Sequence, residues 1–199
     1  MPGCGDGYVT GDDNHANAWQ TCAMRQLLLL RHAKSSWDDS SIPDRDRPLN
    51  ARGRRSVARM RLALRAHGLA PDLVLVSGAK RTLQTLEALE PWDDVPLIEP
   101  MDSLYLASAT QLLETLRAVA DTVRSVMLIG HNPGMHDLAL ALAAPPGTPA
   151  ERTAAGSLAE GFPTCALAEF TVPATWSLLG PGGGRLQRFL TPRGLEASD

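Results

Sequence analysis

The sequence predicts an α/β fold, a three-layer αβα sandwich in which helices cover both faces of a mainly parallel central sheet. Short apolar runs at residues 27–30, 73–76 and 125–129 are each followed by a helix-compatible segment, an alternation typical of parallel sheets. The first run is four consecutive leucines, which favours a strand buried on both faces. With 199 residues and 44% hydrophobic content, the chain can bury one sizeable core, so we expect one folded domain.

Composition excludes several classes of function. The net charge of −3 disfavours nucleic acid as a partner, and a phosphate site would need a local cluster of cations. No run of about 18 apolar residues is present, so no membrane span is expected. Cys4, Cys22 and Cys165 include no Cys-x-x-Cys pair. We therefore expect neither a disulfide framework nor a zinc site, and a protein of the reducing cytoplasm.

Residues 1–23 differ from the rest of the chain in composition. They are rich in Gly, Asp and Asn, and they lack the basic start and apolar stretch of a secretory signal. We expect a disordered N-terminal extension at 1–23 and a folded domain at 24–199. Because Met24 directly precedes the first strand, a start codon placed too early is the alternative to a genuine flexible arm.

The first strand, at residues 26–30, leads into a polar loop at 34–49 that is long enough to be functional. Asn50 then offers an N-cap to a helix that runs to His67 and closes at Gly68. The apolar stripe of this helix contains Val57, Met60 and Leu64. Its six arginines, between positions 52 and 65, form either a solvated face or a docking surface for an acidic partner.

The alternation of strand and helix continues to the end of the chain. The strand at 73–76 precedes a short helix with Leu83 and Leu86. The remaining predicted elements are a brief strand at 96–98, a helix opened by the capping box Ser108-Ala109-Thr110-Gln111, a strand at 125–129, a helix from Pro133 to Leu142, a surface loop at 145–161, and strands at 166–172, 176–179 and 185–191.

Three strand-to-helix junctions place polar side chains at one edge of the predicted sheet. Arg31 and His32 follow the first strand, Arg81 follows the second, and His131 follows the strand at 125–129. Ligands of parallel α/β sheets bind outside the carboxyl ends of the strands, where these side chains would meet. The alternatives are a buried strand that merely ends in a polar pair, arginines in structural salt bridges, and a core histidine with satisfied hydrogen bonds.

This combination fits a phosphoryl site. Two arginines can each bind a tetrahedral dianion through paired hydrogen bonds, and helix N-termini add backbone N–H groups. A neutral imidazole is nucleophilic near pH 7 and can attack phosphorus without a strong external base. His131 and His136 are five residues apart and fall on different helix faces, with no Asp or Glu at metal-ligand spacing. A metallophosphatase is therefore disfavoured, and no metal or cofactor is expected.

Four motifs in order carry a resemblance to a known family. They are Arg31-His32-Ala33-Lys34-Ser35-Ser36-Trp37, the segment 44–53 with Arg47-Pro48-Leu49-Asn50-Ala51-Arg52-Gly53, the segment 77–85, and Ile129-Gly130-His131-Asn132-Pro133-Gly134. Together they resemble the phosphohistidine phosphatase (SixA-type) branch of the histidine phosphatase superfamily, which implies the phosphoglycerate mutase-like fold. The resemblance reaches about residue 194, through Phe162-Pro163-Thr164, Trp176 and Leu190-Thr191-Pro192-Arg193.

The resemblance implies roles for the matching residues. His32 would be the nucleophile that becomes phosphorylated, and Arg31 and Arg81 would clamp the phosphoryl oxygens. His131 would stabilise the equatorial charge of the transferring group, and it is expected to bind substrate together with Ser77.

The sequence departs from the family pattern in two places. Ser77-Gly78-Ala79 replaces the more usual Ser-Pro-Ala, which loosens the turn before Arg81. Larger members carry a glutamate acid after the third strand, whereas this chain offers Asp102, with Glu99 nearby. Asp102 is therefore the candidate general acid, and an ordinary loop aspartate is the alternative. A phosphohistidine substrate would need such an acid less, because its leaving imidazole is itself basic.

The sequence thus predicts a metal-independent phosphatase that acts through phospho-His32 on a phosphorylated protein, with phosphohistidine as the expected group. A small phosphomonoester such as a phosphosugar is the alternative substrate. The short segment between Ile98 and Ser108 argues against it, because little chain remains to build a lid. A phosphate-binding module without turnover is a second alternative, disfavoured by the intact set of two histidines and two arginines.

Overall fold

The computed structural model describes residues 24–196, so the extension predicted at 1–23 lies outside the described residues. The described chain forms one six-stranded sheet with the order β3-β2-β4-β1-β5-β6. Among these strands only β5 runs in the direction opposite to the other five, which confirms the predicted mainly parallel sheet. The strands are β1 (Arg25–Arg31), β2 (Leu73–Ser77), β3 (Leu97–Met101), β4 (Ser125–Gly130), β5 (Leu167–Val172) and β6 (Arg185–Leu190).

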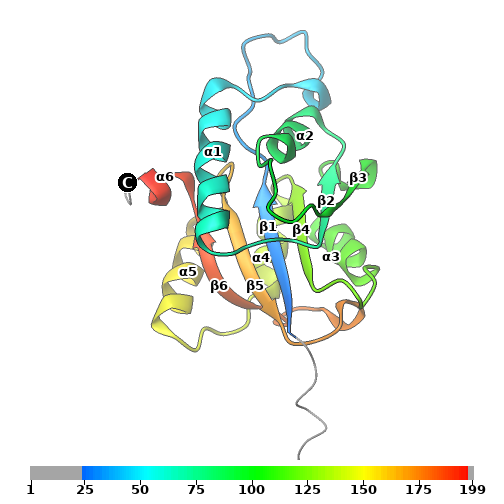
Figure 1. Ribbon diagram of the computed structural model, residues 1–199, viewed down its shortest axis with the longest axis vertical. Helices are drawn as coiled ribbons and strands as arrows, with labels where there is room; N and C mark the ends of the chain where they lie inside the picture. Colours follow the sequence, from blue (N-terminus) through cyan, green and yellow to red (C-terminus); the bar gives the residue numbers. More distant parts are fainter. Residues whose placement is uncertain (1–23, 197–199) are drawn as a thin grey trace, which may run out of the picture.

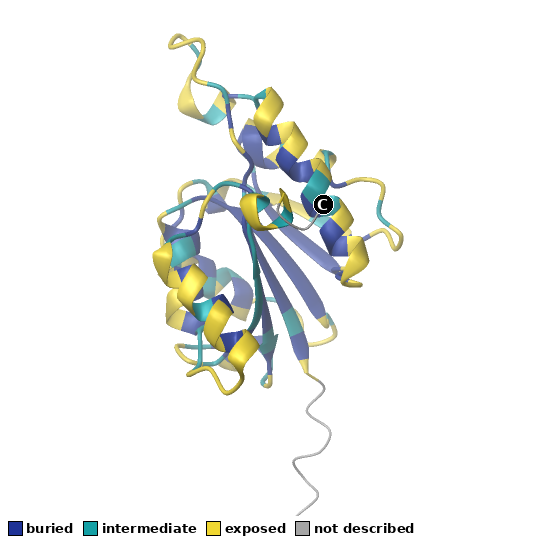
Figure 2. Cartoon of the chain, turned by 90° about the vertical axis from the view of Figure 1, so that its left-hand side faces the viewer, coloured by how far each residue is buried: buried dark blue, intermediate teal, exposed yellow. Residues whose placement is uncertain are grey.

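Helices cover both faces of the sheet, as Figures 1 and 2 show from two directions. On one face lie α1 (Ala51–Ala66) and α2 (Lys80–Glu87), with α6 (Pro192–Glu196) packed against α1. On the other face lie α3 (Ala109–Arg117), α4 (Gly134–Leu142) and α5 (Pro149–Glu160). The predicted three-layer sandwich is therefore confirmed. None of the helices between residues 24 and 196 has the length and apolar content that a membrane crossing requires.

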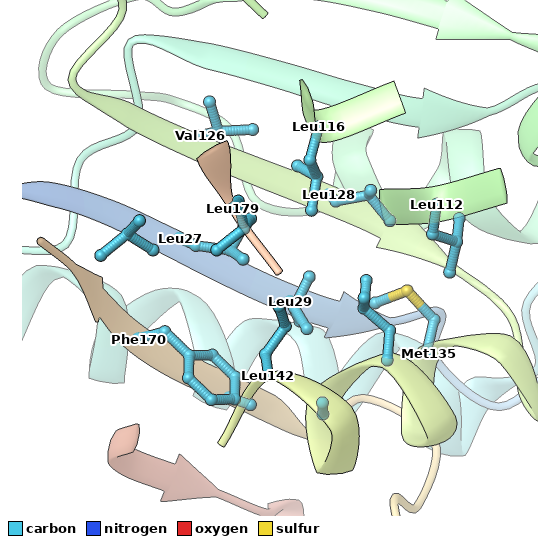
Figure 3. Packing of buried hydrophobic residues seen from close by; sticks show 14 of the residues in the cluster. Leu27, Leu29, Leu112, Leu116, Val126, Leu128, Met135, Leu142, Phe170 and Leu179 are labelled. Atoms are coloured by element: carbon cyan, nitrogen blue, oxygen red, sulfur yellow. The ribbon is translucent and has the colours of Figure 1, made fainter. Parts of the chain in front are cut away.

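The four leucines of β1 join the two halves of the core. Leu27 and Leu29 pack in the cluster that includes α3 and α4, which Figure 3 shows, whereas Leu28 and Leu30 pack in the cluster that includes α1. The alternation follows from the period of two in a strand, and all four side chains are completely buried. Each contributes roughly 1.5–3 kcal/mol by leaving water, so β1 holds its carboxyl end firmly in place.

Both ends of α1 and the start of α3 form as expected. The Asn50 side chain accepts a hydrogen bond from the Gly53 N–H at 2.8 Å and caps α1. At the other end, Gly68 has a φ of +63°, a left-handed conformation that glycine adopts without strain. The capping box between Ser108 and Gln111 opens α3, also as predicted.

The arginines of α1 make contacts within the chain. Arg61 and Arg65 donate to the backbone carbonyl oxygens of Glu90 and Pro91, at 2.6 and 2.8 Å. Arg59 pairs with Glu196 of α6 at 2.6 Å. These contacts tie α1 to its neighbours, which favours a structural role for the arginines over an acidic docking surface.

The predicted surface loop at 145–161 is wrong, because most of this segment is α5. Thr148 accepts a hydrogen bond from the Glu151 N–H, and the Glu151 carboxylate accepts from the Thr148 N–H, both at 3.1 Å. This capping box, with Pro149 at the first helical position, starts the helix. Ala154 and Leu158, four residues apart, then bury one face. The Ala, Pro and Gly content of the segment concealed this Thr-x-x-Glu signal.

The predicted strand at 176–179 is also wrong. The segment forms a 3-10 turn, η3 (Trp176–Leu178), in which the Trp176 side chain is completely buried. The Trp176 indole donates to the carbonyl oxygen of Val123, in the loop that follows α3, at 2.9 Å. This hydrogen bond and the burial of the ring hold the segment in place without strand pairing. Both edges of β5 are already occupied, by β1 and β6.

Candidate active site

The strands that end at the predicted site are neighbours in the sheet. β4 lies between β1 and β2, and its register places Gly130 beside Arg31 and Ile129 beside Val76. The residues that follow these strand ends therefore meet at one edge. They line a cleft of about 410 Å³, together with the loop at 34–49. The lining residues named below are Arg31, His32, Ser35, Trp37, Asp44, Arg47, Arg81, His131 and Asn132.

Two glycines allow the chain to approach this edge closely. A Cβ on Gly53 would overlap the backbone of Lys34, so α1 can pack directly against the residues that follow His32. A Cβ on Gly134 would overlap the backbone of Ala107, so the first turn of α4 can lie against the start of α3. Both contacts are with backbone atoms, which cannot rotate away as a side chain can.

His32 is held as a neutral imidazole, and one of its nitrogens has no hydrogen-bond partner among the described residues. Its Nδ1 lies 2.8 Å from the Ala33 carbonyl oxygen, which can only accept, so Nδ1 carries the hydrogen and Nε2 keeps its lone pair. Burial lowers the pKa of His32 to about 4, and the positive charges of Arg81, Arg31 and Arg47 act in the same direction. The free Nε2 is therefore available as a nucleophile at neutral pH.

His131 is neutral as well, but in the other tautomer. Its Nδ1 accepts from Arg81 Nη2 at 3.2 Å, since a guanidinium can only donate. The hydrogen must then be on Nε2, which donates to Ser77 Oγ at 2.8 Å. Burial is the main cause that lowers the pKa of His131 to about 3, with additional contributions from His32 and Arg81. Both ring nitrogens of His131 are thus engaged within the protein.

Arg31 and Arg81 line the cleft, and each has an N–H donor that the described chain leaves without an acceptor. Arg81 donates from Nη1 to the Asp44 carbonyl oxygen at 2.5 Å and from Nη2 to the Asp44 carboxylate at 3.0 Å. Arg31 donates from Nη1 to the Phe162 carbonyl oxygen at 2.7 Å. In both side chains the buried Nε has no partner among residues 24–196. Burial, then repulsion from Arg81, lowers the pKa of Arg31, which an anion in the cleft would oppose.

The structure brings Arg31, His32, Arg81 and His131 together as predicted, but Ser77 and Asp102 lie elsewhere. Ser77 is completely buried and does not line the cleft; its hydroxyl contacts His131 instead. Asp102 begins the 3-10 turn η2 (Asp102–Leu104), and its side chain is 75% exposed and paired with Arg45. Asp102 is not among the cleft residues, and its role as an acid stays a prediction.

The glycine at position 78 is explained by the same pair. A Cβ at Gly78 would meet the Asp102 carboxylate and the Arg45 guanidinium. The departure from the family's usual proline therefore accompanies an ion pair that packs over this turn.

Sequence reasoning missed several residues of the cleft wall. Asp44 and Arg47 form an ion pair with an Oδ1–Nη2 distance of 3.0 Å. The Tyr105 hydroxyl donates to the Asp44 carboxylate at 2.7 Å, and Asn132 donates to the Phe162 carbonyl oxygen at 3.0 Å. Asp44, Arg47 and Asn132 lie in motifs of the family resemblance, but no role was assigned to them, and no periodic pattern identified which charged residues of the loop at 34–49 face the cleft.

No group of three or more His, Cys, Asp or Glu side chains in the part of the chain that the structure describes could hold a metal ion. His136, which the sequence places near His131, donates from Nε2 to the Leu158 carbonyl oxygen at 2.8 Å and is absent from the cleft wall.

Known proteins match this chain in sequence and in structure. A family model of the histidine phosphatase superfamily (branch 1) matches residues 27–102. An uncharacterised protein of Mycobacterium tuberculosis is 37% identical over 164 residues, which are 82% of this chain and 100% of that protein. The "putative phosphohistidine phosphatase SixA" of Agrobacterium tumefaciens has a TM-score of 0.70 at 32% identity, covering 84% of this chain and 98% of its own.

A structure of the protein histidine phosphatase SixA complexed with tungstate has a TM-score of 0.67 at 26% identity, covering 85% of this chain and 99% of its own. The family-model match spans the strand, loop and helix that carry His32 and Arg81. The matches to whole proteins extend the agreement over the rest of the sheet. The chain therefore belongs to the histidine phosphatase superfamily.

Proposed function

We propose that this phosphatase hydrolyses phosphohistidine on a protein through a covalent phospho-His32 intermediate. The observation that carries the proposal is the state of His32. Its imidazole is neutral, its Nδ1 hydrogen is fixed by the Ala33 carbonyl oxygen, and its free Nε2 lies in a cleft with Arg31 and Arg81. An unprotonated imidazole nitrogen beside two guanidinium groups is suited to attack phosphorus.

In the first step, Nε2 of His32 forms a bond to phosphorus while the bond from phosphorus to the leaving nitrogen breaks. Arg31 and Arg81 would hold the phosphoryl oxygens with guanidinium donors, among them the Nε atoms that have no hydrogen-bond partner among residues 24–196. The leaving imidazole of a phosphohistidine takes up a proton easily because it is basic. For this reason the exposed Asp102, held by Arg45, need not supply one.

His131 would act on the transferring group through its charge. In the free protein both of its nitrogens are engaged, so it can donate to a phosphoryl oxygen only after Nδ1 gains a proton. A bound dianion favours that proton, because a negative charge opposes the burial that lowers the pKa of His131. Arg81 Nη2 would then turn from His131 to the phosphoryl oxygens.

In the second step, water attacks phosphorus and the bond to His32 Nε2 breaks, which restores the free imidazole. The Nδ1 hydrogen bond to Ala33 keeps the ring in one orientation throughout. Every proposed group is a protein side chain or water, so the proposal includes no metal and no cofactor. The cytoplasm remains the expected location.

The substrate class is supported by the similar SixA structures, one of which is a protein histidine phosphatase complexed with tungstate. Only η2 and four further residues separate β3 from α3 at Ala109, so this part of the chain provides little cover for a small molecule. A small phosphomonoester remains the alternative substrate, and a binding module without turnover remains the alternative to catalysis.

Phosphate release from three classes of substrate tests the proposal. A phosphohistidine peptide should turn over faster than an aryl phosphate and a panel of sugar phosphates, and the His32→Ala variant should release almost none. Preference for a sugar phosphate would favour the small-molecule alternative. Binding of phosphate by the wild type without turnover of any substrate would favour the binding module.

A further inference from the structure

The carboxylate of Asp44 lies between two arginines of the cleft. Its Oδ2 is 3.0 Å from Arg81 Nη2, and its Oδ1 is 3.0 Å from Arg47 Nη2. Tyr105 donates a third hydrogen bond to Oδ2 at 2.7 Å. The Asp44 side chain is 46% exposed, whereas those of Arg81 and Arg47 are 3% and 9% exposed. One half-exposed carboxylate thus forms ion pairs with two buried guanidinium groups.

Arg47 has more donors than its surroundings use. Its guanidinium lies on the Trp37 ring, 3.4 Å from the ring centroid, and its Nη2 also lies 3.4 Å from Ser35 Oγ. Its Nε and Nη1 are buried and have no hydrogen-bond partner in the described chain. A buried guanidinium with unused donors is costly unless an anion binds there. Arg47 lines the same cleft as His32 and contributes to lowering the pKa of that imidazole.

The two oxygens of the Asp44 carboxylate contact Arg81 and Arg47 in the way that two oxygens of a phosphoryl group could. We propose that Arg47 is a third phosphoryl-binding cation and that Asp44 is an internal anion which the substrate displaces from Arg47 and Arg81. The inference rests on the proposed function, because it concerns the anion that His32 would attack.

Displacement of Asp44 is inexpensive. The residue lies in the 3-10 turn η1 (Asp44–Asp46), which has no buried residue, and its carboxylate can leave directly into water. Although both arginine side chains are buried, water reaches the half-exposed carboxylate and screens its attraction to them. A phosphoryl dianion carries about two charges against the single charge of the carboxylate, so it competes well for the same donors.

Arg81 keeps its orientation when the carboxylate leaves. Its Nη1 still donates to the backbone carbonyl oxygen of Asp44, a contact that does not depend on the side chain. Arg47 likewise stays on the exposed Trp37, since a planar guanidinium stacks on an aromatic ring in a way that a lysine ammonium cannot. Replacing Asp44 by Asn should therefore remove the competing negative charge while both arginines keep their positions.

Calorimetric titration with tungstate, a tetrahedral dianion, and separately with inorganic phosphate tests both parts. Asp44→Asn should bind tungstate about fivefold more tightly than the wild type, a change that corresponds to ~1 kcal/mol. The matched control is Asp46→Asn, which removes the same charge from an exposed side chain of the same turn and should bind like the wild type. Weaker binding by Asp44→Asn, or equal tightening by Asp46→Asn, would overturn the role of Asp44 as a competing anion.

Arg47→Met should weaken tungstate binding about tenfold or more, whereas Arg45→Met should bind nearly as the wild type does. The Arg45→Met control removes the same positive charge two residues earlier in the chain, from a side chain that pairs with Asp102. If Arg47→Met does not fold, Arg47→Lys keeps the charge but loses the flat stack on Trp37, and it should bind severalfold more weakly than the wild type. Unchanged binding in either Arg47 variant would overturn the role of Arg47.

The same titrations separate this inference from the function on which it rests. If the wild type binds tungstate and the variants at positions 44 and 47 bind it equally well, the roles proposed for Arg47 and Asp44 are refuted while the phosphatase proposal stands. If the wild type binds neither tungstate nor phosphate, both proposals fail.

Discussion

The imidazoles of His32 and His131 lie with their centroids 5.1 Å apart and are held in opposite tautomers. His32 keeps its hydrogen on Nδ1 because that nitrogen faces a carbonyl oxygen. His131 keeps its hydrogen on Nε2 because its Nδ1 faces the Arg81 guanidinium. Burial keeps both rings neutral. Of their four nitrogens, Nε2 of His32 alone has no hydrogen-bond partner within residues 24–196, so it is the one that can bond to phosphorus.

The tautomers can be observed directly by NMR. In long-range proton–nitrogen spectra of histidine-labelled protein at pH 7, His32 should show a protonated Nδ1 and His131 a protonated Nε2. Both rings should stay neutral at pH 5.5, because burial lowers their pKa values to about 4 and about 3. The variants His32→Asn and His131→Asn assign the signals. A cationic ring at either position at pH 6 would refute the prediction.

The same two pKa values predict an acid-sensitive fold. An unfolded histidine takes up a proton as the pH falls below about 6.5, whereas the folded His32 resists protonation until about pH 4. The unfolded state therefore binds more protons in this window, and His32 alone should lower the free energy of unfolding by about 1–3 kcal/mol as the pH drops from 6.5 to 4, with His131 acting in the same direction. Urea unfolding across this range measures the slope, which should be smaller in His32→Asn. An equal slope in that variant would show that other groups cause the acid sensitivity.

The sequence predicts the four central residues of the cleft because each stands at a fixed place in a regular element. Arg31 ends β1 and His32 follows it, Arg81 lies in the first turn of α2 after β2, and His131 follows β4. Their positions at the ends of three adjacent strands bring them together. Asp44 and Arg47 lie in a loop without periodicity. Its ends are closed by an isolated bridge between Ser35 and Leu49, and such a contact depends on the folded core.

The helix α5 was missed although its sequence contains a local signal for a helix start. Its Thr148-Pro149-Ala150-Glu151 start is a local signal and could have been found in the sequence. By contrast, the position of Asp102 could not, because its exposed pairing with Arg45 joins two 3-10 turns that are far apart in the chain.

Ser77→Ala should lower turnover about 10- to 100-fold, or ~1.4–2.8 kcal/mol of barrier, while tungstate binding changes little. The substitution leaves the buried Nε2–H of His131 without its acceptor, so the ring no longer holds one tautomer and one orientation. Steady-state kinetics should show the loss in kcat rather than in KM, and the NMR signal of His131 should move. The control Ser177→Ala removes a hydroxyl from an exposed residue of η3, which follows the end of β5 that pairs with the start of β1, away from the cleft. A loss confined to KM would show that Ser77 binds substrate directly.

Asp102→Asn should leave hydrolysis of a phosphohistidine peptide within about threefold of the wild-type rate. Asp102 is exposed, paired with Arg45 and outside the cleft, and a leaving imidazole needs little help from an acid. An aryl phosphate and an alkyl phosphate, measured side by side, show whether the residue acts at all. A loss of about 100-fold or more with the alkyl phosphate alone would identify Asp102 as the general acid for poor leaving groups.

His32→Ala should lower turnover by about a thousandfold or more, corresponding to ~4 kcal/mol of barrier. The variant loses the only group proposed to attack phosphorus. Tungstate binding should largely survive, since Arg31 and Arg81 remain. The control His136→Ala removes an imidazole that lies outside the cleft, and its turnover should stay close to that of the wild type. Near-normal turnover in His32→Ala would assign the attack to another group.

The covalent intermediate provides the sharpest test of the nucleophile. Wild-type protein that is turning over a labelled phosphohistidine peptide at neutral pH, when quenched rapidly in alkaline denaturant, should carry trapped phosphate. A phosphorus–nitrogen bond to an imidazole is labile in acid and stable in base, whereas a phosphoserine ester resists acid. The label should therefore survive base, disappear on prolonged exposure to acid, and map to the peptide that contains His32. It should be absent from His32→Ala and, because Arg81 supports attack by His32 rather than replacing it, accumulate more slowly in Arg81→Met. An acid-stable label on Ser35, Ser36 or Ser77 would mean that the nucleophile is a hydroxyl and that His32 has another role.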